Sequence, residues 1–275
     1  KVFYLPYPLD TNIWNPAVQP LARENNRFRF LYMNTCYERK GWDLLLKAYW
    51  QEFSANDNVE LVIKSYREFD RQEPLEILIA LEAAKLGIDR NKKAPIIIMD
   101  QVMPAKDMPA FMKSADALVS PHRSEGFGLN IWHAMALGVP VVCTDYGGNT
   151  DFTKSDTAWL VPVSGMTRPG QQEIQTFKHY QGITWAEPDL NELRRQMRAC
   201  MLNRDEAARR AKTGASLVAS SYSFGKVMSA FEGMIKTVKP GAWEKLCISR
   251  YIEFLAKQPS EKFESCKKLL TMIEI

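Results

Sequence analysis

The stretch "SPHRSEGFGLNIWHAMALGVPVVCTD", residues 120–145, decides the fold. A strand end is followed by a glycine-broken turn that contains Glu125, by a short apolar helix that contains His133, and by the apolar run "PVVC". The order strand, turn, helix, strand is typical of one crossover in a parallel sheet. His133 is the unexpected residue, because apart from Asn130 the rest of its helix is Leu, Ile, Trp, Ala and Met.

The sequence on both sides of this stretch repeats the same alternation of strands and helices. Continuous apolar strands are typical of a sheet that is covered on both faces. The intervening segments 41–54, 74–87 and 108–114 have helical length and amphipathic spacing. We therefore predict a doubly wound parallel α/β (Rossmann-like) domain. Its predicted strands are Phe28–Asn34, Val59–Ser65, Ala94–Asp100, Asp116–Pro121, Pro140–Asp145 and Ala158–Val163.

The part of the chain after the last strand is predicted to be mostly helical. Residues 165–187 are polar and irregular and are interpreted as a surface loop. Helices are expected over 188–202, 205–220 and 223–237, and apolar residues recur at helical spacing again after a break at "KPGAW". This divides the chain into a domain of residues 1–238 and a helical extension of residues 239–275. The extension is expected to pack on that domain or on a domain outside this chain.

Composition limits the class of protein. The chain has 275 residues, 46% of them hydrophobic and 25% charged, which suits a globular protein with a full-sized core. The net charge is +4 and there is no dense Lys/Arg block, so no nucleic-acid partner is expected. There are five scattered cysteines and no CxxC pair, which predicts free thiols, a cytoplasmic location and no zinc site. The chain begins "KVFYLPYPLD", without Met and strand-like, and we expect it to be a piece of a longer protein.

The turn after residue 124 is the first candidate binding element. Gly126 and Gly128 allow the backbone to approach a ligand and to enter a helix, whose N-terminus favours phosphate. Glu125 is suited to accept hydrogen bonds from sugar hydroxyls. The alternative is a plain glycine turn with an exposed glutamate. His133 lies roughly 7–8 Å along the helix axis, near the depth of a ribose, and its alternative is a core histidine bonded to a backbone carbonyl.

Two further loops end at the same edge of the predicted sheet. Arg39 and Lys40 precede a helix in "NTCYERKGW", where a cation could neutralise a leaving diphosphate. Two solvated loop charges are the alternative interpretation. In "DQVMPAKDMP", residues 100–109, the backbone groups of Gln101, Val102 and Met103 are candidates for reading a nucleobase edge.

Several of these segments together resemble the retaining GT-B glycosyltransferases with a Glu-x7-Glu signature. "EGFGLNIWHAMALGVPVV" is similar to the family pattern E-G-F-G-L-x-x-x-E-A-M-A-x-G-x-P-V-V. "PYPLDTNIWNP", "RKGWDLLLKAY", "KDMPAFMKSADALVSPHRSEGFG" and "WAEPDLNELRRQMRACMLN" match other family segments in the right order. The resemblance covers about residues 1–238.

This resemblance implies the C-terminal, nucleotide-sugar-binding half of a retaining, metal-independent, hexosyltransferase-type enzyme of polysaccharide biosynthesis. It implies that Glu125 and Lys40 carry the chemistry at the donor sugar and its diphosphate. It implies further that donor oxygens are held by the turn residues Gly126, Phe127, Gly128 and Leu129. The donor is a nucleotide-diphosphate sugar, and no other cofactor and no metal is expected.

Two positions depart from the family pattern. The second signature glutamate, which contacts the ribose, is His133 here, and the basic residue five positions before Lys40 is Thr35. A histidine still hydrogen-bonds a ribose hydroxyl. Arg39 is a candidate for the missing charge, and His122 and Arg123 are further candidates to face the phosphates.

Two functions remain open from the sequence. One is an active transferase whose acceptor-binding domain precedes Lys1, acting on a glycan, lipid-linked or protein acceptor, with peripheral membrane association of the full protein as a further expectation. The other is a degenerate, inactive GT-B domain that serves as a binding or scaffolding module. The departures from the family pattern at Thr35 and His133 favour this second function. An epimerase-like activity is disfavoured, because "RKGWDLLLKAY" and the helical tail resemble transferases.

Overall fold

The structure is a computed structural model that describes residues 4–65 and 74–237. The chain divides into two compact units. The larger comprises Ile13–Leu217, and the smaller comprises Lys1–Asn12 together with Val218–Ile275. The predicted helices of residues 239–275 lie outside the described residues, so the domain boundary at residue 238 stays a prediction.

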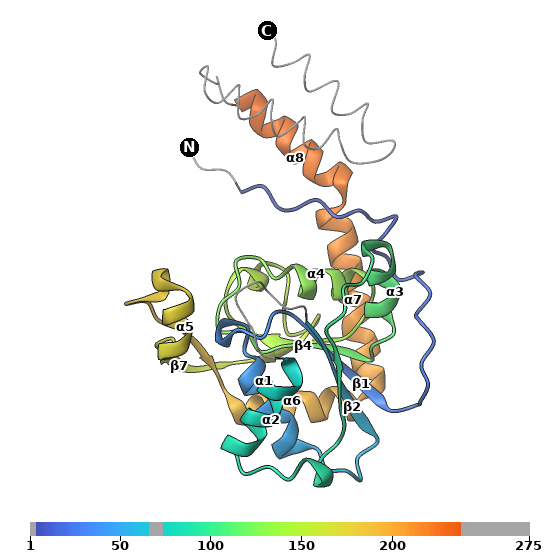
Figure 1. Cartoon of the computed structure of the whole chain (residues 1–275). Coiled ribbons are helices and arrows are strands. Elements are labelled where there is room, and N and C mark those ends of the chain that lie inside the picture. Colours follow the sequence, from blue (N-terminus) through green and yellow to red (C-terminus); the bar gives the residue numbers. More distant parts are fainter. Residues whose placement is uncertain (1–3, 66–73, 238–275) are drawn as a thin grey trace. The chain divides into compact units, whose positions relative to one another are not determined.

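The larger unit is built on a six-stranded parallel sheet of order β3-β2-β1-β4-β5-β6 (Figure 1). The register pairs Phe28 with Val59 and Leu118 with Val141. This confirms the predicted doubly wound α/β fold, with strands one or two residues shorter than expected at most ends. The strands are β1 (Phe28–Met33), β2 (Val59–Lys64), β3 (Ile96–Met99), β4 (Ala117–Ser120), β5 (Val141–Thr144) and β6 (Trp159–Val161).

Helices cover both faces of this sheet (Figure 1). On one face lie α1 (Trp42–Glu52), α2 (Leu75–Lys85) and α6 (Leu190–Leu202), and on the other lie α3 (Met108–Lys113) and α4 (Leu129–Ala136). The core under α1 and α6 is aromatic and aliphatic, because β1 and β2 direct Phe30, Tyr32 and Leu61 into it, each at most 1% exposed. Burial of this size is the main stabilising term of such a unit.

The segment predicted as a surface loop is instead an ordered element, which we call the arm (residues 163–188). It is an antiparallel pair of β7 (Val163–Thr167) and β8 (Trp185–Pro188), connected through α5 (Gln171–Thr176) and the 3-10 turn η5 (Lys178–Tyr180). The loop prediction was wrong because β7 is mostly exposed and lacks alternating apolar residues, so the strand has no hydrophobic pattern.

In the smaller unit, the described residues 4–12 form no strand, contrary to the strand-like appearance of the opening. They make a single bridge, in which the Leu9 N–H donates to Tyr222 O at 2.7 Å. Pro6 and Pro8 remove backbone donors from this segment, which explains the missing ladder. The predicted helix 223–237 is present as α8 (Phe224–Thr237), and 205–220 corresponds to α7 (Arg204–Tyr222).

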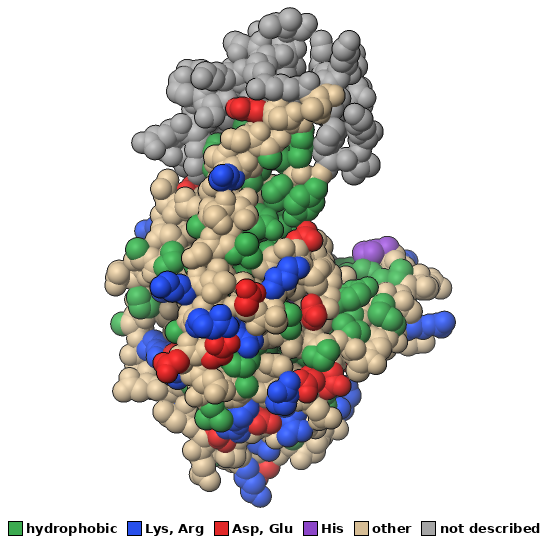
Figure 2. Space-filling model, turned by 180° about the vertical axis from the view of Figure 1, so that it is seen from behind, with side chains coloured by type: hydrophobic (Ala, Val, Ile, Leu, Met, Phe, Trp, Pro, Cys, Tyr) green, Lys and Arg blue, Asp and Glu red, His purple; other side chains and the backbone are tan. Residues whose placement is uncertain are grey.

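The surface carries charges of both signs. On the face seen in Figure 2, basic and acidic side chains alternate, with no large region of one sign. Several of these charges pair within one helix, for example Arg195 with Glu192 at 2.6 Å and Arg209 with Glu206 at 2.7 Å. This face therefore lacks the basic footprint that nucleic-acid binding requires.

Candidate functional site

A pocket of about 660 Å³ opens in the larger unit beyond the carboxyl ends of β1 and β2. This is the edge at which doubly wound sheets bind their ligands. Three lining residues are basic, and no lining residue is acidic. The lining residues are Trp14, Met33, Asn34, Thr35, Tyr37, Arg39, Lys40, Lys64, Ala105, Met108, Asn130, His133, Phe177 and Tyr180.

The predicted glycine turn lies beside this pocket and connects to it through an ion pair. Lys40 Nζ lies 2.5 Å from Glu125 Oε1, and both side chains are nearly buried, at 14% and 11% exposed. Gly128 adopts the left-handed conformation, with φ +89°, and begins α4. The side chains of Phe127 and Leu129 do not line the pocket. The ring centroid of Phe127 lies 5.1 Å from that of Phe152, and Leu129 is 47% exposed. Gly126 is also exposed and outside the lining.

Two glycines hold the loops of the site against one another. A Cβ on Gly41, where η1 (Glu38–Lys40) passes into α1, would lie 1.9 Å from Pro121 O. A Cβ on Gly148, in the loop after β5, would lie 1.9 Å from Gly126 O. Side chains therefore cannot enter either contact, and the loops after β1, β4 and β5 meet backbone to backbone.

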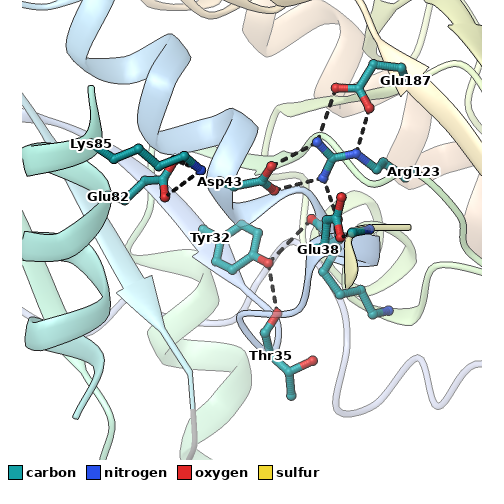
Figure 3. A network of polar contacts seen from close by, with 10 residues as sticks. Tyr32, Thr35, Glu38, Asp43, Glu82, Lys85, Arg123 and Glu187 are labelled. Atoms are coloured by element: carbon teal, nitrogen blue, oxygen red, sulfur yellow. Dashed lines mark hydrogen bonds and ion pairs between the residues drawn. The ribbon is translucent and has the colours of Figure 1, made fainter. Parts of the chain in front are cut away.

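Thr35, Arg39 and Lys40, three of the candidate residues from the sequence, line the pocket together. The buried Tyr32 hydroxyl of β1 donates to Thr35 O at 3.0 Å, which fixes the loop between β1 and η1 (Figure 3). Arg39 donates from Nε to the Tyr180 hydroxyl at 3.0 Å and from Nη1 to Ser124 O at 2.9 Å.

Arg123 does not face the pocket, which corrects the sequence expectation. Its guanidinium is 5% exposed and lies between the carboxylates of Asp43 and Glu187, with Nη1–Oδ1 and Nε–Oε2 distances of 2.8 and 2.7 Å (Figure 3). Burial by itself lowers the pKa of Arg123, but the hydrogen bonds and charges of the two carboxylates hold it well above its ordinary value. Arg123 therefore links α1 to the arm beneath the site.

His122 is also turned away from the pocket and is fully buried. Its Nε2 lies 2.9 Å from Tyr146 O and 3.0 Å from Asn149 Oδ1, and its Nδ1 lies 3.0 Å from Ser120 O. Asn149 in turn donates to Thr144 O, which fixes its amide orientation. Burial lowers the pKa of His122, so the ring is a neutral connector between the loops after β4 and β5. The expectation that it faces phosphates is wrong.

His133 lies on the pocket wall, stacked on Trp14. The two ring centroids are 3.8 Å apart and the rings are nearly parallel, at 8°. Burial lowers the pKa of His133 to about 4, so the imidazole is neutral near pH 7. His133 is of intermediate exposure and lines the pocket, so it is not the core histidine of the alternative interpretation. Its contact with a ribose stays a prediction.

The third predicted loop lies at the edge of the site. Val102 is 89% exposed, and neither it nor Met103 lines the pocket. Lys64, at the end of β2, enters the pocket and donates to Gln101 O at 2.6 Å. Burial lowers the pKa of Lys64 below its ordinary value.

Several lining residues were missed from the sequence. Lys64 carried a usable signal, since a lysine ends the strand directly after the apolar run Leu61–Ile63. Asn130 donates to Met33 O and Asn34 Oδ1, and so ties α4 to β1. Phe177 and Tyr180 belong to the arm and had no signal once that segment was interpreted as a loop.

The family model for group 1 glycosyl transferases matches residues 27–168. The chain belongs to the group 1 glycosyltransferases. The matched region includes β1 to β6 and the glycine turn, whereas the pocket residues Trp14, Phe177 and Tyr180 lie outside it.

Curated relatives of this group 1 domain are longer proteins. The D-inositol 3-phosphate glycosyltransferase of Arthrobacter sp. is 26% identical over 148 residues, which are 52% of this chain and 34% of that protein. The chain thus spans about a third of the length of the curated relatives it matches.

Solved structures agree with this group 1 domain in fold. The C-terminal domain of a group 1 family glycosyl transferase (LpcC) from Francisella tularensis matches with a TM-score of 0.56 and 16% identity, covering 78% of this chain and 99% of that one. HepE of Anabaena, solved with UDP and glucose, matches with a TM-score of 0.61 and 16% identity, covering 84% and 56%.

The described residues show neither a cluster of metal ligands nor a helix that could span a membrane. In residues 4–65 and 74–237, no three His, Cys, Asp or Glu side chains gather as metal ligands would. No helix within these ranges combines the length and apolar character that a bilayer span requires.

Proposed function

We propose that this chain is the nucleotide-sugar-binding half of a retaining, metal-independent glycosyltransferase. The observation that carries the proposal is the Lys40–Glu125 ion pair, 2.5 Å long, between the pocket and the glycine turn that begins α4. It joins a cation suited to a diphosphate with a carboxylate suited to sugar hydroxyls. The membership in the group 1 family supports the same assignment.

The diphosphate of the donor would lie against the basic wall of the pocket. Arg39, Lys40 and Lys64 line that wall, and the carboxylate that pairs with Lys40, Glu125, lies outside the lining residues. The N-terminus of α4 adds the partial positive charge of the helix dipole. In a partly buried pocket such charges stabilise the leaving diphosphate much more strongly than they would in water.

The reaction exchanges one bond of the anomeric carbon for another. The bond from that carbon to the diphosphate oxygen breaks, and its electron pair departs with the diphosphate. The acceptor oxygen forms a bond on the same face, and its proton passes to the departing phosphate oxygen. Lys40 and Arg39 would stabilise the negative charge that develops there, and Glu125 would hold the sugar through its hydroxyls.

The nucleoside would extend toward His133 and the end of β2. A neutral imidazole both donates and accepts one hydrogen bond, so His133 would contact a ribose hydroxyl without the two-oxygen grip of a carboxylate. Gln101, Val102 and Met103 would lie by the base. The UDP bound by HepE, a protein of the same fold, makes a uridine nucleotide the first ligand to test.

The acceptor would be held mainly by a domain outside this chain. The chain spans about a third of the length of relatives such as the Arthrobacter D-inositol 3-phosphate glycosyltransferase, whose name describes a sugar transfer. A glycan, a lipid-linked sugar or a protein remains the proposed acceptor class. We propose a cytoplasmic location, with the described thiols Cys36, Cys143 and Cys200 free and buried.

A binding or scaffolding module is the second candidate. The observation that favours it is the stack of Trp14 on His133, which places a neutral aromatic pair where the family pattern has a ribose-binding carboxylate. Such a module would bind a nucleotide sugar without turning it over.

Calorimetry with this chain tests donor binding directly. We expect heat with at least one of UDP, GDP and ADP or their sugars, and at least tenfold weaker binding by Lys40→Met, since a charge-assisted contact contributes about 1.5–3 kcal/mol. Lys92→Met is the matched control, because Lys92 is 81% exposed and pairs with Asp89 on the surface. Absence of heat with every nucleotide and sugar would overturn the donor site.

Turnover by the full-length protein separates the two candidates. An active transferase should lose most of its kcat on Glu125→Gln, which keeps the size of the side chain and removes its charge. The binding module is supported instead if the unmodified protein binds the nucleotide sugar without turnover and Glu125→Gln leaves its affinity for the nucleotide sugar unchanged.

A further inference from the structure

The arm (residues 163–188) is attached to the loops of the pocket at several points. The Gly170 N–H donates to Glu38 Oε2 at 2.8 Å, and the Ala186 N–H donates to Arg123 O at 3.1 Å. Glu187 of β8 adds its two-oxygen contact with Arg123. These contacts tie the arm to η1 and to the loop after β4, the two segments that carry Arg39, Lys40 and Glu125.

The arm also contributes a wall of the pocket, and there it meets Arg39. The Tyr180 hydroxyl accepts from Arg39 Nε at 3.0 Å, while Ser124 O accepts from Nη1 at 2.9 Å. Both acceptors are neutral oxygens, so these bonds orient the guanidinium without neutralising its charge. Its other N–H donors, among the five that a guanidinium has, are left for a ligand in the pocket.

The position of the Tyr180 hydroxyl is itself fixed by packing. The Tyr180 ring lies 5.2 Å from the ring of Phe177 and 5.6 Å from that of Trp185, centroid to centroid. Trp185 is 2% exposed, and Phe177 packs on the buried Tyr37 at 4.8 Å. A hydroxyl on a ring held in this way restricts the rotamers of Arg39 before a ligand arrives, which lowers the entropy cost of binding.

We propose that Tyr180 is a positioning residue that holds Arg39 toward the diphosphate of the donor, so that the arm is a working part of the donor site. Arg39 thereby supplies the cation that is missing at Thr35. This inference rests on the proposed function, since it assumes that the pocket binds a nucleoside diphosphate.

A double-mutant cycle on the full chain tests this inference. Tyr180→Phe keeps the ring and removes the hydroxyl, and Arg39→Gln removes the charge. With the nucleoside diphosphate that binds best among UDP, GDP and ADP, Tyr180→Phe should weaken binding roughly three- to tenfold, as expected for one hydrogen bond. The loss should shrink to less than twofold in the Arg39→Gln background, because Tyr180 acts through Arg39.

The corresponding free nucleoside, which lacks phosphates, serves as the internal control. If Tyr180 acts by orienting Arg39, Tyr180→Phe leaves the affinity for the free nucleoside unchanged. If Tyr180→Phe loosens the whole pocket, it weakens the binding of the nucleoside and of the nucleoside diphosphate alike. Equal losses for the two ligands would therefore overturn the inference. So would a Tyr180→Phe loss of the same size with and without Arg39.

The outcomes also separate this inference from the proposed function. If the unmodified chain binds no nucleotide, the proposed function fails. If it binds a nucleoside diphosphate and Tyr180→Phe binds it equally well, the donor site stands and the role of Tyr180 is wrong. The thermal midpoint of Tyr180→Phe, compared with that of the unmodified chain, checks that the variant is folded.

Discussion

The indole of Trp14 lies parallel to the imidazole of His133, with 3.8 Å between the ring centroids. Trp14 comes from the segment before β1 and His133 from the middle of α4, so the stack joins two distant parts of the larger unit. The contact gives His133 an apolar neighbour on one face, and burial lowers its pKa to about 4. This pair makes the pocket wall neutral at a point where a carboxylate would make it anionic.

The pKa of His133 predicts a loss of stability in mild acid. Its folded value of about 4 lies below the ordinary 6.5, so the unfolded chain binds more protons between these values. Stability is therefore full above about pH 6.5 and decreases as the pH falls toward 4. Between pH 7 and pH 5 we expect His133 to account for a loss of about 2 kcal/mol. Urea unfolding of the unmodified chain and of His133→Gln at pH 7 and pH 5 measures this loss of unfolding free energy. The variant should lose less stability between the two pH values, and equal losses would contradict the lowered pKa of His133.

Removal of Trp14 should raise the pKa of His133. In Trp14→Ala, water reaches the imidazole face that the indole covers, so the charged form is less disfavoured. We expect the pKa to rise from about 4 toward 6.5. NMR titration is practical because the chain has three histidines. His122 is the control, since it is buried among other residues and its pKa should not move; an unchanged His133 would show that Trp14 does not shield it.

Loss of Arg123 should destabilise the larger unit strongly. Arg123→Met leaves the carboxylates of Asp43 and Glu187 close together without their cation, and we expect a cost of about 2–4 kcal/mol. Arg195→Met is the matched control, because Arg195 pairs with Glu192 on an exposed helix face, where a cost below about 1 kcal/mol is expected. Chemical unfolding compares the two variants. Similar costs for both would mean that the Arg123 cluster is no stronger than a surface pair.

A methyl group at Gly148 should distort the glycine turn. Its Cβ would lie 1.9 Å from Gly126 O. Because this oxygen belongs to the backbone, it cannot move away as the end of a flexible side chain could. Gly148→Ala is therefore expected to weaken nucleotide binding at least tenfold by displacing Glu125 and the start of α4. In Gly165→Ala, the control on β7, the new Cβ meets nothing within 4 Å, and binding should be unchanged. Unaltered calorimetric affinity in Gly148→Ala would show that the loop after β5 does not support the site.

The sequence predicted the sheet well because its strands are continuous apolar runs. Phe28–Asn34 and Val59–Ser65 needed no long-range information, since the strands are covered on both faces and local hydrophobicity marks them. The sequence also placed Lys40 and Glu125 at the same edge of the sheet, because both follow the carboxyl ends of parallel strands. It did not predict their ion pair.

The arm and its consequences could not be predicted from local sequence. β7 is exposed and lies outside the main sheet, so its residues show no hydrophobic alternation. Arg123 and His122 were candidates to face the phosphates because they directly precede the glycine turn. Their actual partners lie far away in the sequence: Glu187 of the arm contacts Arg123, and Asn149 and Tyr146, after a different strand, contact His122.

The cradle of the site is shaped by main chain rather than by the groups that would touch a ligand. The loops are held together by close main-chain contacts, of Gly41 with Pro121 and of Gly148 with Gly126. Main-chain atoms are the same whatever the side chains are. A side chain on the pocket wall can therefore be exchanged while the cradle keeps its form. Thr35 and His133 both line the pocket, and they are the two positions at which the sequence departs from the pattern it resembles. We expect such departures to change which ligand groups the pocket can bind while leaving the cradle unchanged.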